Sequence, residues 1–310
     1  MQTILGANGT IGRILAKELS RYTDKVRLVS RNPRRINETD ELHPVDLLKA
    51  GAVDTAVEGS DVVYLTVGLE YKLKTWEHQW PLLMRETIDA CIKHNSKLVF
   101  FDNIYMYGKD AVPHMTEESV MSPASRKGSV RKQILEMLLS AERQGKITAL
   151  IARSADFYGP DNKNSFVNEM VLKNLAAGKK AMWFMNDNFV HSFTYTPDAA
   201  AATALLGNTP DAYGQVWHLP TDSTRLTGTD FIKMCAEELK VKPRITVLSP
   251  FMVSILGIFI PVMREMPEMM YQYDRDYFFD SLKFTTRFGI TATPYLTGIR
   301  ESCKNFLPKR

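Results

Sequence analysis

The chain has 310 residues and is 45% hydrophobic, so it can bury a large core in one large domain or two smaller ones. Its 39 basic and 35 acidic residues give a net charge of +4, and their scattered distribution argues against nucleic acid or a membrane as a partner. Three distant cysteines and the lack of a His-x-x-x-His pair predict no disulfide framework and no metal site, which favours a reducing, cytoplasmic location.

Strands alternate with helices over the first half of the chain. Short apolar runs predict strands at residues 2–5, 26–29, 61–67, 97–101 and 147–151, and Val45 falls in a further short one. Apolar residues at helical spacing predict helices at 11–19, 77–94 and 130–141. This alternation predicts an α/β fold with a doubly wound parallel sheet.

The regular alternation of predicted strands and helices ends after residue 160. The pattern there predicts a helix at 166–175, a helix from Thr196 onward, strands at 190–195, 215–219 and 245–248, and a last helix at 296–306. The most apolar stretch, 251–263, contains a glycine and a proline and is too short to span a bilayer. We therefore expect it to form a buried helix.

Three glycines lie between the first strand and the first helix, in the spacing Gly6-x-x-Gly9-x-x-Gly12. The first permits a tight turn, the second lets the backbone approach a pyrophosphate, and the third allows close packing of helix and strand. The helix N-terminus supplies free N–H groups and a dipole that favour anions. An ordinary strand–helix turn is the alternative. The pattern predicts a Rossmann-type dinucleotide site formed by Gly6, Asn8, Gly9, Thr10, Ile11 and Gly12.

The end of the second strand distinguishes the two nicotinamide dinucleotides. An acidic residue there would bind the ribose 2′-hydroxyl of NAD, whereas this chain has Ser30 and Arg31, with Arg34 and Arg35 close behind. Because a guanidinium suits a 2′-phosphate, we expect NADP as the cofactor, with NAD possible and a solvated basic loop as the alternative. Asp46 either accepts a hydrogen bond from the adenine amino group or is a surface loop residue.

Four further motifs follow the glycine loop in a characteristic order. They are Asp-Val-Val-Tyr-Leu-Thr at 61–66, Phe-Asp-Asn-Ile-Tyr-Met-Tyr-Gly at 101–108, Arg-Ser-Ala-Asp-Phe-Tyr-Gly-Pro at 153–160, and Phe-Thr-Tyr-Thr-Pro-Asp at 193–198. Together they resemble the extended short-chain dehydrogenase/reductases, the NAD-dependent epimerase/dehydratase family, over nearly the whole chain. The resemblance implies a Rossmann domain at 1–160 and 187–220 and a smaller C-terminal α/β substrate-binding region at 161–186 and 221–310, with the substrate between them.

The same resemblance implies further binding residues. Thr66 and Gly68 would contact the cofactor, while Tyr71, Ser154 and His191 would contact the substrate. Nucleotide-sugar enzymes of the family often carry an Arg-Asp pair near position 191, where this chain has His-Ser, and this departure argues against a nucleotide sugar. A lone histidine on a strand is also often a structural residue. We expect Arg153 to be structural.

The chain departs from the family where the chemistry is expected. The family places a serine or threonine at the end of the fifth strand and a Tyr-x-x-x-Lys pair on the next helix, whereas this chain has Asp102-Asn103 and Lys127 with Arg131. One Tyr-x-x-x-Lys does occur, at residues 105 and 109, but it follows a strand and is not on a helix. We interpret it as accidental, although Tyr105 itself can face the cleft.

Lys127 and Arg131 are neighbours on one helix face because they are four residues apart. The guanidinium can bind the ribose hydroxyls of the cofactor, and nearby positive charge with partial burial would let Lys127 act as a general acid or base. The alternative is a solvated basic helix start that only holds a phosphate.

The sequence thus predicts an atypical reductase or epimerase that transfers hydride at a carbon bearing oxygen. Its substrate would be a small molecule with a carbonyl or hydroxyl group, and a homodimer is possible. Asn103, Tyr105 and Lys127 would contact the reacting oxygen, and Arg131 would hold the ribose. The other interpretation is a catalytically silent NADP-binding protein that senses redox state or regulates a partner.

Overall fold

The computed structural model describes residues 1–162 and 165–307. The chain divides into two compact units. The first unit comprises Met1–Asn103, Lys127–Arg153 and Ala199–Leu219, and the second comprises the other segments, Ile104–Arg126, Ser154–Asp198 and Pro220–Arg310.

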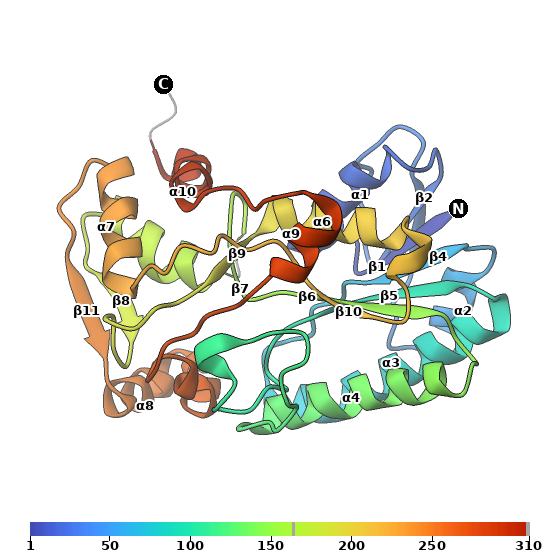
Figure 1. Ribbon diagram of the computed structural model, residues 1–310, viewed down its shortest axis with the longest axis horizontal. Helices are drawn as coiled ribbons and strands as arrows, with labels where there is room; N and C mark the ends of the chain where they lie inside the picture. Colours follow the sequence, from blue (N-terminus) through green and yellow to red (C-terminus); the bar gives the residue numbers. More distant parts are fainter. Residues whose placement is uncertain (163–164, 308–310) are drawn as a thin grey trace. The chain divides into compact units, whose positions relative to one another are not determined.

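The first unit is built on a seven-stranded sheet in which every neighbouring pair is parallel (Figure 1). The strand order is β3-β2-β1-β4-β5-β6-β10. The strands are β1 (Gln2–Leu5), β2 (Val26–Ser30), β3 (Glu41–Pro44), β4 (Val62–Leu65), β5 (Lys97–Asp102), β6 (Ala149–Arg153) and β10 (Val216–His218). The doubly wound parallel sheet predicted from the apolar runs is confirmed.

The strand order reverses at β1, which lies between β2 and β4. Leu5 at the end of β1 is in register with Val29 on one side and Leu65 on the other. In open α/β sheets, ligands bind outside the carboxyl ends of the strands at such a switch point. The segments that follow β1, β2 and β4 therefore define the edge of the first unit where a ligand is expected.

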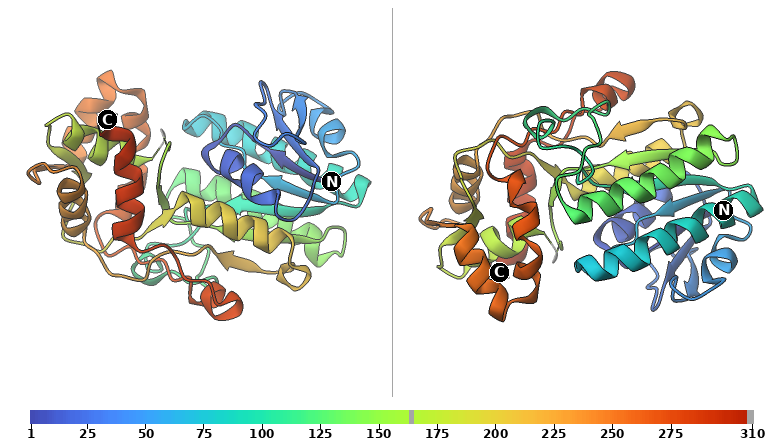
Figure 2. Two further views of the ribbon diagram at one scale, coloured as in Figure 1. Left: turned by 90° about the horizontal axis from the view of Figure 1, so that it is seen from above. Right: turned by 90° about the horizontal axis from the view of Figure 1, so that it is seen from below.

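Helices cover both faces of this sheet. In Figures 1 and 2, α1 and α6 lie on one face, and α3 and α4 lie on the other. The helices are α1 (Thr10–Leu19), α2 (Ala52–Val57), α3 (Leu73–His94), α4 (Arg126–Arg143) and α6 (Thr196–Gly207), with the short η3 at Pro210–Ala212. The apolar residues of α1 that recur at helical spacing, including Ile11, Leu15 and Leu19, are buried, which is why this segment folds as a helix on the sheet.

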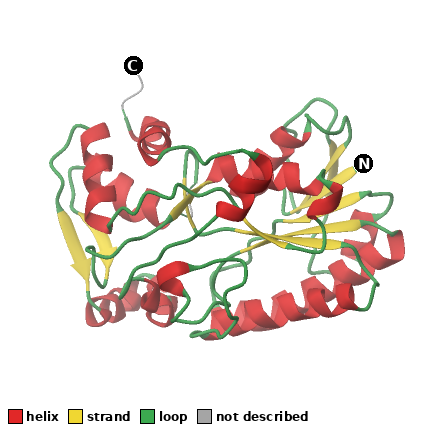
Figure 3. Cartoon of the chain, viewed as in Figure 1, coloured by secondary structure: helices red, strands yellow, loops and turns green. Residues whose placement is uncertain are grey.

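The second unit contains two short parallel strand pairs, drawn in yellow in Figure 3, and several helices. The pairs join β7 (Asp156–Tyr158) to β9 (Phe193–Tyr195) and β8 (Ala181–Phe184) to β11 (Ile245–Leu248). The helices are η1 (Val112–His114), η2 (Val167–Leu172), α5 (Lys173–Ala176), α7 (Gly228–Glu238), α8 (Pro250–Phe259), η4 (Pro261–Glu265), η5 (Pro267–Gln272), α9 (Leu282–Phe288), α10 (Tyr295–Cys303) and η6 (Lys304–Phe306). Buried aromatic rings, among them Tyr158, Trp183, Phe193 and Phe231, form its core.

The expectation of a buried helix at 251–263 is wrong. The segment forms α8 and η4, and in α8 only Val253 and Gly257 are buried, whereas Phe251 and Phe259 are 73% and 79% exposed. A helix that is apolar on all sides normally lies inside a protein, but this one packs through one side only. No helix within residues 1–162 and 165–307 is both long and apolar enough to cross a membrane.

Several boundaries also differ from the expected ones. The third strand ends at Pro44, just before Val45, and α3 begins at Leu73 and continues through Pro81. The expected helix at 166–175 consists of a π-helical segment and a short α-helix. The expected strand at 190–195 is regular only from Phe193, because Val190 and His191 form isolated bridges with other segments.

Candidate functional site

The glycine loop connects β1 to α1 through close backbone contacts. Gly6 has a φ of +94°, and a Cβ there would lie 2.8 Å from the backbone of Val67. A Cβ on Gly12 would lie 2.6 Å from the Gly6 carbonyl oxygen, so the helix approaches the loop as only glycine allows. The N-cap residue Gly9 makes no side-chain cap hydrogen bond, and a helix N-terminus of this kind, directly after a glycine loop, favours an anion.

Other predicted loop residues lie in the same unit around this turn. The Asn8 side chain donates to the Asn32 carbonyl at 2.6 Å, which ties the glycine loop to the segment after β2. Thr66 follows β4, and its hydroxyl donates to the Leu5 carbonyl at 3.1 Å, so it also borders the loop. Thr10 and Ile11 form the first turn of α1, and Gly68 lies two residues beyond Thr66.

The end of β2 carries a buried hydroxyl that has no partner among the described residues. It belongs to Ser30, next to the exposed Arg31. Neither Arg31 nor the exposed Arg34 forms an ion pair within the part of the chain that the structure describes. Arg35, in contrast, donates to the carbonyl oxygens of Glu38 and Asp40. A hydroxyl without a partner, followed in sequence by Arg31 and Arg34, is a set of donors that suits a phosphate group.

Asp46 lies just after β3 and has a local role in the structure. Its carboxylate accepts from the Leu48 N–H at 3.2 Å, and its carbonyl accepts from the Lys49 N–H at 3.0 Å. These bonds stabilise the turn that leads toward α2. A carboxylate can accept several hydrogen bonds, so contact with an adenine amino group stays a prediction.

The carboxyl end of β5 holds a buried ion cluster, Arg131–Asp102–Arg153. The Asp102 side chain is fully buried. Its Oδ1 accepts from Nε of Arg131 at 3.0 Å and from Nη2 of the same guanidinium at a shorter distance, and its Oδ2 accepts from Nε and Nη2 of Arg153 at 3.3 and 3.2 Å. One carboxylate therefore binds two guanidinium groups, from α4 and from β6.

Aromatic rings enclose the Arg131 guanidinium. Its central carbon lies 4.6 Å from the Trp80 ring centroid and 4.8 Å from that of Phe100. The Trp80 Nε1 is itself buried and has no hydrogen-bond partner among the described residues. Rings on α3 and β5 thus hold the guanidinium plane, while Asp102 fixes its direction.

Lys127, in the first turn of α4, is completely buried at 0% exposure. Its Nζ lies 4.9 Å from the ring centroid of Tyr71, so the structure brings together two of the residues predicted for the site. Lys127 and Arg131 share the α4 helix four residues apart, as expected from the spacing. Asn103 directly follows Asp102 at the end of β5.

His191 lies in the second unit and is enclosed by aromatic rings. Its Nε2 is 3.0 Å from Asp156 Oδ2, and its ring stacks on Tyr277 at 4.2 Å and on Tyr273 at 4.7 Å between centroids. The Tyr273 hydroxyl donates to the same Asp156 oxygen at 3.3 Å. Burial, with the Asp156 charge, raises the pKa of both tyrosines well above the ordinary value.

The two remaining predicted residues also lie in the second unit. Ser154 is buried, and its hydroxyl donates to the Ala155 carbonyl at 3.0 Å. Tyr105 is partly buried and packs against the apolar cluster that contains Tyr277 and Phe279.

Sequence reasoning did not identify two of the partners in these clusters. The sequence indicates Asp102 only as the residue at the serine position of the family, and it gives no role to Asp156. Asp102 ends the apolar run of β5, whereas Asp156 begins the short strand β7, so the signal described next applies to Asp102. Such a residue needs a partner when buried, and this signal was available.

Three comparisons with known proteins extend these observations. The sequence profile of the NAD dependent epimerase/dehydratase family matches residues 3–219. No curated protein sequence matches the chain. Among solved structures, UDP-N-acetylglucosamine 4-epimerase from Bacillus cereus is 14% identical with a TM-score of 0.77, covering 98% of this chain and 95% of its own.

Two further structures are similar over almost their whole length. UDP-glucose 4-epimerase from Thermus thermophilus, in complex with NAD, is 16% identical with a TM-score of 0.78 and 99% coverage of both chains. UDP-glucuronic acid 4-epimerase from Bacillus cereus, in complex with UDP-glucuronic acid and NAD, is 15% identical with a TM-score of 0.81 and the same coverage. At this identity the likeness concerns the fold alone. The profile match spans more than half of the sequence, and the chain therefore belongs to the NAD dependent epimerase/dehydratase family.

Proposed function

We propose that this chain is an NADP-dependent oxidoreductase or epimerase that transfers hydride at a carbon bearing oxygen, with Lys127 as its acid/base residue. The observation that carries the proposal is the complete burial of Lys127 against Tyr71, on the helix that also carries Arg131. The bound dinucleotide would supply the hydride or accept it. The protein must then provide a proton at the substrate oxygen, or remove one from it.

Lys127 suits this role because its amine is held in place. A buried ammonium group over an aromatic face is restricted in orientation, so its N–H bonds point in fixed directions. The family's tyrosine occupies the corresponding helix position in typical members. In this chain the lysine would donate its proton to a carbonyl oxygen as that oxygen gains charge. Asn103 and Tyr105 are proposed as further hydrogen-bond partners of that oxygen.

Arg131 would hold the ribose and keep its proton throughout. Arginine does not deprotonate in proteins, so it cannot be the acid. The Nε and Nη2 atoms of Arg131 donate to Asp102. The Nη1 atom of Arg131 forms no hydrogen bond within the described residues and can donate to a ribose hydroxyl. Asp102 thus acts as a positioning residue for Arg131.

The fit of Ser30, Arg31 and the glycine loop supports NADP as the cofactor. The two similar structures described above were solved with NAD, and in this chain the residues at the end of β2 favour a 2′-phosphate. One charge-assisted hydrogen bond of about 1.5–3 kcal/mol predicts roughly ten- to a hundredfold tighter binding of NADPH than of NADH.

A small carbonyl or hydroxyl compound is the substrate class we propose, with a homodimer as a possible assembly. One similar structure contains UDP-glucuronic acid. Here, however, His191 occupies the position near the expected Arg-Asp pair, is 3% exposed and is bound to Asp156. A histidine enclosed in this way is a poor substitute for an arginine that binds a diphosphate.

A second candidate function rests on the ion cluster. Because Asp102 already occupies one edge of the Arg131 guanidinium, and the tyrosine of the family is replaced, a protein that binds NADP without turnover is the alternative. Such a protein would sense redox state or regulate a partner.

Two measurements test the proposed function. Titration of the protein with NADPH and NADH should show the ten- to hundredfold preference, and Arg31→Ala should remove most of it, whereas Arg143→Ala at the exposed end of α4 should not. A panel of aldehydes and ketones with NADPH, and UDP-glucose with NAD as a separate arm, should then identify a carbonyl substrate. Tight NADPH binding without any turnover favours the silent alternative, and equal affinity for both cofactors contradicts the NADP assignment.

A further inference from the structure

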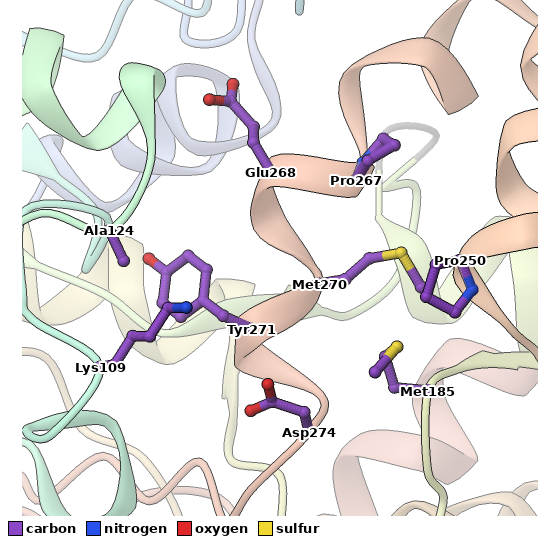
Figure 4. A pocket seen from close by; sticks show the side chains of 9 residues that line it. All are labelled: Lys109, Ala124, Met185, Pro250, Pro267, Glu268, Met270, Tyr271 and Asp274. Carbon is purple, nitrogen blue, oxygen red and sulfur yellow. The ribbon is translucent and has the colours of Figure 1, made fainter.

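A cavity of about 330 Å³ lies within the second unit. This volume is in the range of small-molecule sites in proteins. It is lined by Lys109, Ala124, Met185, Pro250, Pro267, Glu268, Met270, Tyr271 and Asp274 (Figure 4). None of these side chains belongs to the proposed hydride-transfer site, so the cavity needs an explanation of its own.

Polar and apolar side chains lie on different sides of the cavity. In Figure 4, Lys109 and Tyr271 lie on one side, and Pro250 and Met185 lie on the other. Lys109 is the lysine of the Tyr-x-x-x-Lys match at residues 105 and 109, and its Nζ lies 6.0 Å from the Tyr271 ring centroid. The cavity therefore has a polar side with a cation and an apolar side.

The Tyr271 hydroxyl is the strongest indication of a ligand. The residue is 6% exposed, and its hydroxyl has no hydrogen-bond partner among the described residues. Burial raises the pKa of Tyr271 to about 12, although the nearby Gln272 and Ser125 side chains lower it somewhat. The phenol is therefore protonated at neutral pH and can donate. A buried donor without an acceptor is rare in folded proteins.

Lys109 is the cation among the side chains that line the cavity, and Asp274 and Glu268 are its carboxylates. Asp274 already accepts from Arg275 Nε at 2.5 Å, and Glu268 accepts from the Arg126 N–H at 2.7 Å. Lys109 has no carboxylate within 4.0 Å in residues 1–162 and 165–307. An anionic oxygen group would satisfy both the ammonium and the phenol.

The apolar side suits a hydrocarbon. Met185 and Met270 are adaptable side chains that fit ligands of varied shape. Met185 also has a φ of 54°, a conformation that costs a non-glycine residue free energy and is found preferentially at ligand sites. Pro250 begins α8, so the exposed apolar Phe251 and Met252 directly follow the cavity lining in sequence.

We infer that this cavity binds a small amphipathic carboxylate, with its anionic group on Lys109 and Tyr271 and its apolar body against Met185, Met270 and Pro250. Most of the lining lies in the ranges that the family resemblance assigns to substrate binding, but the test of this inference needs neither a dinucleotide nor a reacting carbonyl.

Titration calorimetry of the full chain without cofactor tests this inference. The probes are octanoate and 4-phenylbutyrate, with octan-1-ol and octylamine as the neutral and cationic counterparts. At least one carboxylate should bind saturably to one site, and the alcohol and the amine should bind at least about tenfold more weakly. Absence of saturable carboxylate binding, or equal or tighter binding of the amine, overturns the inference.

Two variants locate the site. Lys109→Met should weaken carboxylate binding at least about tenfold, since it removes the charge from an exposed and foldable position. Tyr271→Phe should weaken it several-fold without lowering Tm, because the hydroxyl has no partner to lose. Lys242→Met, at an exposed lysine of the same unit, is the control. Unchanged affinity in Lys109→Met places the carboxylate elsewhere and overturns the inference.

Discussion

Each unit has a carboxylate near the end of a strand, and the negative charges of these two carboxylates are stabilised in different ways. Asp102 at the end of β5 has a side chain that is completely buried between two guanidinium groups. Asp156 at the start of β7 is 21% exposed at its side chain and contacts one histidine and one tyrosine hydroxyl. The first carboxylate depends fully on its cations, whereas water can solvate the second, and this difference sets how much each contributes to stability.

The largest effect on stability is expected from Asp102→Asn. Removing the charge takes the carboxylate away from two buried guanidinium groups, those of Arg131 and Arg153, so the free energy of unfolding should fall by about 3–5 kcal/mol. Urea denaturation followed by circular dichroism measures this. A loss below about 1 kcal/mol would show that the cluster is solvated or rearranges, and the comparison with Asp156 would fail.

A smaller effect is expected from Asp156→Asn. The amide can still accept from one partner, and water reaches the site, so a loss of about 1–2 kcal/mol follows from the weakened bonds to His191 and Tyr273. The same denaturation experiment gives the value. If this variant is as unstable as Asp102→Asn, partial exposure does not protect the second carboxylate.

The smallest effect on stability is expected at a third carboxylate, Asp198, which forms no ion pair with any residue that the structure describes. Asp198 accepts from the backbone N–H and the hydroxyl of Thr293, and burial raises its pKa above the ordinary value of 3.8. The folded state therefore holds the proton more tightly than the unfolded state, and Asp198 costs stability as pH rises through its raised pKa. Asp198→Asn should gain Tm relative to the parent chain between about pH 4 and neutrality. Parallel Tm profiles would contradict this.

The sequence predicted the parts of this molecule that depend on short-range patterns. The spacing of Gly6, Gly9 and Gly12 after an apolar strand is sufficient to predict the loop, and the buried strands appear as continuous apolar runs. The family motifs are likewise local. These features need no knowledge of which segments meet.

The parts that were missed depend on long-range contacts. Asp102 meets Arg131 and Arg153 only because β5, β6 and α4 are neighbours, across separations of 29 and 51 residues. The pairing of His191 with Asp156 spans 35 residues. The exposure of α8 could not be predicted because its sequence is apolar on every face, so no polar side distinguishes the solvent-facing surface.

Two residues of α4, Arg131 and Lys127, differ in the chemistry that they can perform. Arg131 is fixed by Asp102 and by aromatic rings, so it can hold a ligand but does not move a proton. Lys127, four residues earlier, is also buried, and it is the residue to which we assign the proton transfer in the proposed function. The two side chains are therefore expected to separate cofactor binding from the chemical step.

Turnover by Lys127→Met, measured together with its NADPH affinity, tests the proposed acid/base role most directly. The substitution keeps most of the side chain and removes the proton, so kcat on the identified carbonyl substrate should fall by about 10²–10⁴. NADPH affinity should stay within about threefold of the parent, since the glycine loop, Arg31 and Arg131 remain, whereas Arg131→Met should weaken NADPH binding first. Normal turnover in a folded Lys127→Met protein would contradict the account and leave Tyr105 as the next candidate for the proton donor.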